Sequence, residues 1–384
     1  MLEFSIDEMT IVVQLSSKNK SVICAEDWIN VAKNMVADIS TKGNFEKIYG
    51  KKNVVLKNLP EGYTFGYTFG EHNFYIVIAF HEIRIDMGII IRFSAQALDY
   101  YCSESGVSPY ILLQMMQDKN FTTRLSRVDF AVDYIDENVD VTEIYNDLIA
   151  KRIGIFREYI SKKNEVFNKK TDMIIRGYLR ENEVPTLYVG SVQSSSRLRI
   201  YDKKLEQTEK YGNKYDKAQR CQNWVRFEAV FRNTYAHQIG EELLKMSSDD
   251  ELCNFIACTM VSKYKFLNII NGVADSPTDF TLELMNCISK GVYILKSCNT
   301  KNYELLRSIL YLLNGSGIMS TLYKIKIIWG DDALLTFLKF LYEFLDEFVP
   351  NSDCETWLRK NMNDYAGAFP TFGEFFRLNV EPTL

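Results

Sequence analysis

The stretch Arg197-Leu-Arg-Ile-Tyr-Asp-Lys-Lys-Leu-Glu206 begins with alternating charged and apolar side chains. As a β-strand, it would send Leu198 and Ile200 to a core face. The opposite face would carry one phenol and three cations: Arg197, Arg199, Tyr201 and Lys203. Nearby positive charge favours an ionised phenolate, and the same cations would hold a phosphodiester against the phenol oxygen. This stretch predicts either a nucleophilic Tyr201 that attacks a DNA phosphate or an amphipathic strand with a solvated basic face.

Two other predicted strands carry acidic side chains on their polar faces. In Leu125-Ser-Arg-Val-Asp-Phe-Ala-Val-Asp-Tyr-Ile135, the acids Asp129 and Asp133 share a face. In Trp224-Val-Arg-Phe-Glu-Ala-Val-Phe231, Arg226 and Glu228 do the same. Carboxylate oxygens are ligands suited to Mg²⁺ or Mn²⁺. The three acids are therefore candidate metal ligands. The alternative for Asp129 and Asp133 is that they are surface carboxylates that pair with Arg127 and neighbouring basic strands.

Histidine offers little for a metal site. The chain has only His72, His81 and His237, without a His-x-His pair, so a histidine-held metal is not expected. His81 and Glu82 end a predicted strand, and they either reach the same site or serve as hydrogen-bonding residues of the fold.

The charge distribution places a basic segment within an acidic chain. The net charge is −5, yet residues 151–232 hold 19 Lys and Arg against 10 Asp and Glu, a local +9. Residues 241–384 hold 13 against 19, a local −6. This distribution indicates one phosphate-facing surface. Within it, the aromatic residues Phe156, Tyr159 and Phe167 either stack on exposed bases or pack locally.

Other features limit the class of protein. The eight cysteines are scattered without a Cys-x-x-Cys pair, which favours reduced thiols in a cytoplasmic protein. No apolar run approaches the ~18 residues of a membrane span, so no membrane partner is expected. The chain lacks a phosphate-binding Gly-x-x-x-x-Gly-Lys-Ser/Thr loop, a Gly-x-Ser-x-Gly elbow and a Gly-x-Gly-x-x-Gly turn.

The pattern along the chain predicts an α+β protein. Strands are expected within 1–20, where 10–15 is the apolar part, and over 63–69, 74–80, 89–93, 125–135, 186–190, 198–203 and 224–231. This pattern is typical of an antiparallel sheet with flanking helices. Residues 156–172 are expected to be irregular. From residue 236 the pattern is helical almost throughout, including a predicted helix over 249–270. We therefore predict an N-terminal strand and helix (1–60), a catalytic sheet domain (60–238) and an all-helical domain (239–384).

Four segments in order resemble the replication initiation factor family, which comprises rolling-circle plasmid initiators of the staphylococcal type and related relaxases of conjugative elements. The segments are Leu125-Ser-Arg-Val-Asp-Phe-Ala-Val-Asp133, Thr186-Leu-Tyr-Val-Gly-Ser191, Leu198-Arg-Ile-Tyr-Asp-Lys203 and Val225-Arg-Phe-Glu-Ala-Val-Phe-Arg232. The resemblance covers about residues 60–240. The chain departs from the family's glycine-rich turn after the early strand, where it has Ser94-Ala-Gln-Ala97.

The resemblance implies roles for individual residues. The family's nucleophile corresponds to Tyr201, with Tyr188 as the rival, and its metal-binding acids to Asp129 and Glu228, with Asp133 as a third candidate. Arg199 and Lys203 would act beside the nucleophile. Further phosphate contacts are expected from Arg127, Arg197, Lys204 and Arg226.

The implied activity is metal-dependent nicking and closing of a specific DNA site through a 5′-phosphotyrosine intermediate, with Mg²⁺ or Mn²⁺. The expected partners are a partly single-stranded origin of replication or transfer, a second copy of the chain and a helicase. The alternative is a non-catalytic, sequence-specific DNA-binding protein of the same fold.

Overall fold

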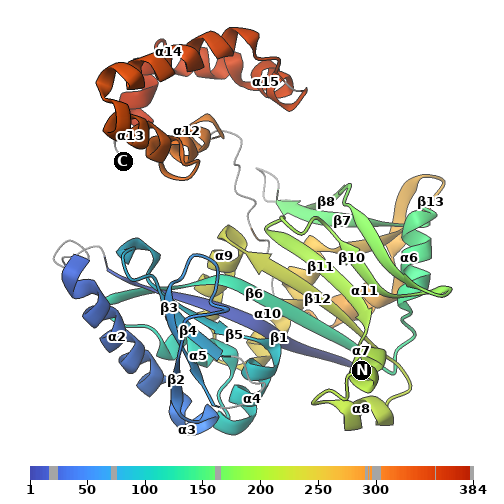
Figure 1. Ribbon diagram of the computed structural model, residues 1–384. Coiled ribbons are helices and arrows are strands. Elements are labelled where there is room, and N and C mark those ends of the chain that lie inside the picture. The colour runs from blue at the N-terminus through green and yellow to red at the C-terminus, as the bar shows by residue number, and fades with distance from the viewer. Residues whose placement is uncertain are drawn as a thin grey trace. The chain divides into compact units, whose positions relative to one another are not determined.

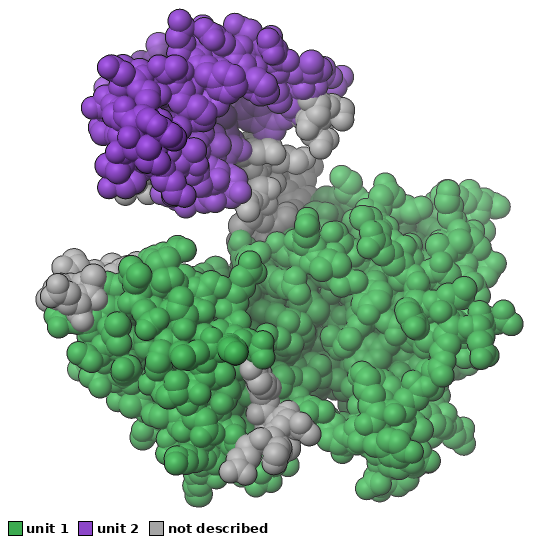
Figure 2. All heavy atoms as spheres, viewed as in Figure 1, with its two compact units in different colours: residues 1–297 green, residues 298–384 purple. Residues whose placement is uncertain are grey.

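A computed structural model describes residues 1–16, 25–70, 76–160, 166–289, 293, 295, 304–350 and 352–380. The chain forms two compact units, residues 1–297 and 298–384 (Figure 2). Antiparallel sheets dominate the first unit, and the described elements of the second are helical (Figure 1). The predicted α+β class is confirmed.

A ten-stranded antiparallel sheet forms the centre of unit 1, in the order β2-β3-β4-β5-β1-β6-β12-β11-β10-β9. Its two longest strands, β1 and β6, are neighbours in the middle of the sheet and pair along most of their length. Its strands are β1 (Leu2–Leu15), β2 (Lys52–Val55), β3 (Phe65–Phe69), β4 (Ile76–Phe80), β5 (Ile89–Phe93), β6 (Phe121–Ile135), β9 (Ile175–Arg180), β10 (Glu183–Val189), β11 (Ser196–Asp202) and β12 (Trp224–Arg232).

Helices of unit 1 flank this sheet (Figure 1). Several begin at the residue types that cap helices, such as Ser94, Asp140 and Ser248, whose side chains accept from the backbone N–H three residues on. The helices are α2 (Ala25–Lys42), α3 (Phe45–Tyr49), the 3₁₀ turn η1 (Ile85–Met87), α4 (Ala95–Ser105), α5 (Pro109–Met115), α6 (Val141–Ile149), α7 (Lys203–Glu209), α8 (Tyr215–Arg220), α9 (Thr234–Leu243), α10 (Asp249–Lys263) and α11 (Asp279–Asn286).

Alternation of side chains fixes which face of the sheet is the core. On β6, Val128, Phe130 and Val132 are fully buried, and they meet the apolar positions of β12 and β11 in one core cluster. Phe130 packs against Phe255 of α10 with ring centroids 5.9 Å apart. The polar positions of the same strands therefore face the opposite side of the sheet.

The first unit extends beyond the predicted boundary at residue 238. Helices α9, α10 and α11 pack on the core face, where Phe280 of α11 lies 5.6 Å from Phe227 of β12. The predicted helix over 249–270 ends at Lys263, because Lys265–Ile270 forms β13 and pairs with β7. The apolar residues of 265–270 are compatible with either a helix or a strand, and the strand forms here because it can pair with β7.

A second, four-stranded antiparallel sheet includes the stretch expected to be irregular. Its order is β14-β13-β7-β8, and β7 and β8 pair antiparallel along residues 156–160 and 166–170. Phe156 is buried, and Tyr159 and Phe167 stack on each other with centroids 5.7 Å apart, so these aromatic residues pack locally in this structure. The strands are β7 (Ile153–Ile160), β8 (Val166–Lys170), β13 (Lys265–Ile270) and β14 (Val273–Pro277).

Unit 2 is helical in its described residues. Helices α13 and α14 have no buried residue in this structure and expose large apolar side chains such as Trp329 and Phe340. The elements are α12 (Glu304–Asn314), α13 (Ile318–Trp329), α14 (Asp331–Glu347), α15 (Ser352–Ala368), α16 (Phe372–Phe375) and a π-helical turn η3 (Phe376–Val380).

The structure bears on two predictions made from composition, the state of the cysteines and the lack of a membrane-spanning segment. The six cysteines within the described ranges are free thiols; Cys24, Cys298 and His72 lie outside those ranges. Among the described helices, none combines the length and apolarity that crossing a membrane requires.

A buried lysine ends α10 and gives a prediction about stability. Lys263 is 4% exposed, with Nζ 3.6 Å from the ring centroid of Tyr235. Burial, with Arg157 nearby, lowers the pKa of Lys263 to about 7. The unfolded chain binds this proton up to a pH of roughly 10.5, so the free energy of unfolding falls as the pH drops from about 10 to about 7.

Lys263→Met should therefore stabilise the protein at pH 7 by about 2 kcal/mol, because it removes a buried charge. The gain should be much smaller near pH 10, where the folded-state lysine is already neutral and the unfolded chain begins to lose the same proton. Urea unfolding at both pH values measures the gain in stability. The control is Lys245→Met, because Lys245 is an exposed lysine just after the end of α9. If Lys263→Met stabilised the protein equally at both pH values, the gain would come from better packing and not from loss of a buried charge.

Candidate active site

The register of three strands brings the predicted polar residues onto one face. Tyr201 of β11 lies opposite Arg226 of β12, which in turn lies opposite Asp133 of β6. One pair further along, Arg199 lies opposite Glu228. Side chains directly opposite in an antiparallel pair share a face, so the sheet brings together residues that are 25 to 93 positions apart in the sequence.

Each of the three predicted metal ligands is paired with an arginine. Arg127 donates two hydrogen bonds to Asp129, at 2.9 and 2.6 Å. Arg226 donates two to Asp133, at 2.6 and 2.7 Å. The Nη2 of Arg199 lies 2.6 Å from Oε2 of Glu228. The polar face is thus a row of charge-assisted hydrogen bonds.

Two acids of β1 complete this row, and the sequence did not single them out. Asp7 accepts from Arg226, and Glu8 accepts from Arg127 at 2.8 Å. A register shift in the β1–β6 pairing occurs between Ile6 and Glu8, which breaks the simple alternation along β1. Strand alternation alone could not have identified both neighbouring acids as site residues.

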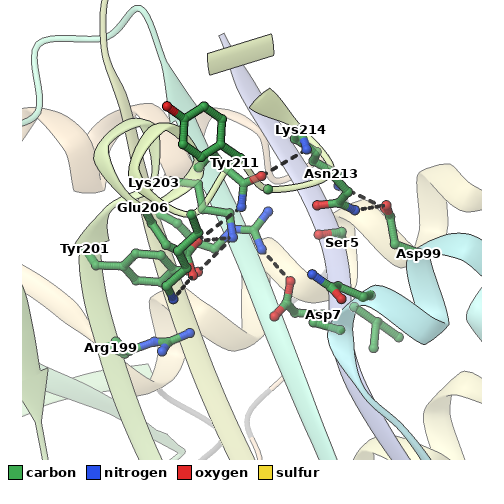
Figure 3. Close-up of a pocket in the computed structure, with 17 residues that line it drawn as sticks. Ser5, Asp7, Asp99, Arg199, Tyr201, Lys203, Glu206, Tyr211, Asn213 and Lys214 are labelled. Carbon is green, nitrogen blue, oxygen red and sulfur yellow. Dashed lines mark hydrogen bonds and ion pairs between the residues drawn. The ribbon is translucent and has the colours of Figure 1, made fainter. Parts of the chain in front are cut away.

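Tyr201 lies at the β11 end of this face, beside Arg199 and Lys203 (Figure 3). Its phenol donates a hydrogen bond to Oε2 of Glu228 at 3.2 Å and accepts one from Nζ of Lys203 at 3.3 Å. The guanidinium carbon of Arg199 is 4.3 Å from the ring centroid. A phenol held between a carboxylate and an ammonium can pass its proton to the carboxylate when it attacks an electrophile.

The sequence predicted that nearby cations favour the phenolate of Tyr201, and this prediction is wrong because the pKa of the phenol is raised. Burial raises the pKa of the phenol well above its usual value near 10, and Glu228 raises it further, although Arg226 and Arg199 act in the opposite direction. Only 4% of Tyr201 is exposed. The resting phenol is therefore protonated, and reaction at this oxygen requires a base. Glu228 accepts the hydrogen bond of this phenol and so lies where it could take the proton.

Lys203 and Lys204 differ in their surroundings. β11 ends at Asp202, whose side chain caps helix α7 by accepting from Leu205 N–H at 2.7 Å. Lys203 begins this helix and is not a strand residue, but it still reaches Tyr201 and pairs with Glu206 at 2.6 Å. Lys204 donates instead to two backbone carbonyls, those of Cys221 and Gln222, away from the phenol.

Glu206 lines the site beside Lys203, but the sequence did not identify it as a site residue. Burial acts to raise its pKa, but Lys203 and Lys210 outweigh burial and lower the pKa of Glu206 to about 2. The same burial, with Arg226 nearby, lowers the pKa of Lys203. The helical spacing of Lys203 and Glu206 would have revealed this pair if a helix had been predicted from residue 203.

A pocket of about 530 Å³ opens beside Tyr201. Figure 3 shows Tyr201, Lys203 and Glu206 on one side of it, and Asp7 and Asp99 on the other. It is bounded by β1, the start of α4, β11, β12, α7 and the loop of residues 210–214. The candidate nucleophile therefore lines a pocket large enough for a small ligand.

The carboxylates do not form a metal site as they lie. Within the described residues, no group of three acidic, histidine or cysteine side chains converges so that it could hold a metal. Burial raises the pKa of Asp129 to about 7; Arg127 opposes this shift, and Glu8 and Glu228 add to it. Hard oxygen donors are present, but an ion would have to displace arginines from Asp129 and Glu228.

The remaining predicted residues lie further from Tyr201's phenol. Arg197 places its guanidinium carbon 4.2 Å from the ring centroid of Tyr188, the rival nucleophile on β10. Neither residue lines the pocket beside Tyr201. His81 accepts at Nδ1 from the backbone N–H of Ile83 and Arg84, which is a structural role in a turn.

Comparisons with known proteins identify a family and a similar solved structure. Residues 123–315, which are 193 of the 384 residues, match the model of a family described as replication initiation factor. Among solved structures, the chain is similar to the rolling circle replication initiator protein from Geobacillus stearothermophilus, with 17% identity and a TM-score of 0.49. That alignment covers 76% of this chain and 100% of the other. No curated protein sequence matched the chain significantly.

Proposed function

The chain belongs to the replication initiation factor family, and from this premise we propose that it nicks and rejoins one strand of an origin of DNA replication, with Tyr201 as the nucleophile. The observation that carries the proposal is the hydrogen bond from the buried Tyr201 phenol to Glu228, made between Arg199 and Lys203. A tyrosine with a base, two cations and an adjoining pocket is suited to phosphoryl transfer.

The proposed step forms one phosphorus–oxygen bond and breaks another. Oη of Tyr201 attacks the phosphorus of a phosphodiester, its proton passes to Glu228, and the bond from phosphorus to the 3′-oxygen breaks. The 3′-oxygen takes a proton from solvent. The products are a 5′-phosphotyrosine and a free 3′-hydroxyl, and the reverse reaction with a 3′-hydroxyl reseals the strand.

Cations beside the phenol would stabilise the phosphate during this step. Lys203 lies against the phenol oxygen, and Arg199 lies over the ring. Charge-assisted hydrogen bonds to the phosphoryl oxygens are strong where water is excluded. Arg226, in contrast, is saturated by Asp133 and Asp7, so it would organise the site instead of contacting the phosphate.

The test is a covalent-adduct assay. Origin DNA is incubated with the protein, and a denaturing gel separates protein-linked DNA from free DNA. We expect an adduct on one strand at one position. Salt-sensitive, specific binding without any adduct under any divalent metal would instead support the alternative, a non-catalytic DNA-binding protein; burial of the Tyr201 phenol is the observation that keeps this alternative open.

A requirement for Mg²⁺ or Mn²⁺ is the part of the proposal that rests on the family resemblance. We expect EDTA to stop adduct formation and either metal to restore it, and Glu228→Gln to slow the reaction at every metal concentration because it also removes the base. Asp129→Asn should raise the metal concentration needed for half-maximal rate. Adduct formation at an unchanged rate in EDTA would mean that the carboxylates act only as partners of the arginines.

The setting of the reaction is also a proposal. We place it in the cytoplasm, on a plasmid origin or on the transfer origin of a conjugative element, since both processes use this chemistry. A second copy of the chain and a helicase remain predicted partners. Analytical ultracentrifugation with and without origin DNA tests the first of these.

A further inference from the structure

The pocket beside Tyr201 has a composition that the nicking step does not by itself require. Among the residues that line it are five cations, namely Arg199, Lys203, Lys210, Lys214 and Arg226. Three acids, Asp7, Asp99 and Glu206, also line the pocket, and the two arginines pair with carboxylates behind it. The side chains of Lys210 and Lys214 are solvent-accessible, so an anionic ligand can reach them.

Its size limits that ligand to a single unit of a nucleic acid. A volume of about 530 Å³ lies within the range of ~300–1,000 Å³ that is usual for small-molecule sites. That volume suits one nucleotide and excludes a base-paired duplex. Only an unpaired strand could therefore deliver a unit into it.

One wall of the pocket is the 210–214 loop, two residues of which contact the same acid of α4. Nδ2 of Asn213 donates to Asp99 at 3.0 Å, and Nζ of Lys214 pairs with the same carboxylate at 2.9 Å. The base of the loop is fixed by Gln207, which is buried and accepts from the Lys214 N–H at 2.9 Å. The loop is thus held against α4 across the pocket (Figure 3).

This loop carries an exposed aromatic platform. Tyr211 is 79% exposed although it lines the pocket, and its ring stacks on Tyr215 with centroids 5.3 Å apart and planes at 19°. Tyr211 has a positive φ of 47°, an uncommon conformation for a residue with a side chain. Exposed aromatic rings next to cations are the surfaces on which unpaired bases stack.

We propose that this pocket binds one unpaired nucleotide next to the scissile phosphate, with its base stacked on Tyr211 and its phosphate among the cations near Lys203. The proposal deepens the proposed function, because it names the part of the substrate that the site recognises. Gln96, at the exposed start of α4, is the amide available at the rim for a base edge.

The test compares two small probes that differ only in the base. Binding of deoxynucleoside 5′-monophosphates and of 2-deoxyribose 5-phosphate to the full chain is measured by titration calorimetry. We expect the nucleotides to bind at least about fivefold more tightly, which corresponds to one stacked base. Tyr211→Ala should remove that difference while leaving the binding of the sugar phosphate unchanged.

The control is Tyr178→Ala, since Tyr178 is also highly exposed but lies on β9 outside the pocket. It should keep the full preference for nucleotides. Equal affinity for both probes in the wild type, or equal effects of the two substitutions, would overturn the proposal. Because neither probe contains a scissile bond, this outcome is independent of whether the chain nicks DNA. Failure of the adduct assay alone would overturn only the nicking function.

Discussion

Tyr201→Phe should abolish the covalent adduct with origin DNA, lowering its rate of formation by about a thousandfold or more. The substitution removes the oxygen that attacks phosphorus and leaves the ring in place, so the loss is that of a nucleophile. The rate is measured from the appearance of protein-linked DNA on denaturing gels. Binding of the same DNA should change little, because the cations around the ring remain.

Tyr188→Phe is the matched control for this experiment. Tyr188 lies on the adjacent strand, and Arg197 stacks on its ring much as Arg199 stacks on that of Tyr201. No hydrogen bond places a base beside it within the described residues. The Tyr188→Phe variant should form the adduct at close to the wild-type rate. If Tyr188→Phe lost the adduct and Tyr201→Phe kept it, the assignment of the nucleophile would be reversed.

Arg226→Met should lower the free energy of unfolding at pH 7 by about 3–5 kcal/mol, the usual cost of removing one partner of a buried ion pair. Arg226 is 2% exposed and donates to both Asp133 and Asp7, so its loss leaves two carboxylates without their partner on the interior of the site. Urea unfolding at pH 7 measures this loss.

Arg180→Met is the control for that prediction. Arg180 pairs with Glu209 across the surface, where both side chains are about half exposed, and such pairs contribute about 0–1 kcal/mol. A loss for Arg226→Met no greater than that for Arg180→Met would mean that the buried ion pairs of Arg226 contribute no more to stability than an exposed pair.

The strand patterns predicted the sheet and the composition of its polar face. Alternation in residues 125–135 and 224–231 separates core from polar positions, and the structure confirms that separation. The resemblance to the replication initiation factor family is confirmed by the match over residues 123–315. These features are local or depend on the order of short segments, which a sequence displays directly.

Contacts across the sheet could not be predicted in the same way. Pairing of Arg226 with Asp133 and Asp7 depends on strand order and on an irregular register in β1, neither of which is local. The raised pKa of Tyr201 depends on burial, which the count of neighbouring cations in the sequence does not reveal. The extent of unit 1 depends on aromatic packing between the sheet and helices that follow residue 238.

The identity of the residue bonded to DNA tests the central claim most directly. After reaction, the adduct is digested with nuclease and protease, and the peptide that carries the remaining nucleotide is sequenced by mass spectrometry. We predict that the nucleotide is attached through its 5′-phosphate to Tyr201. Attachment to Tyr188 or to any other residue would contradict the account of this site.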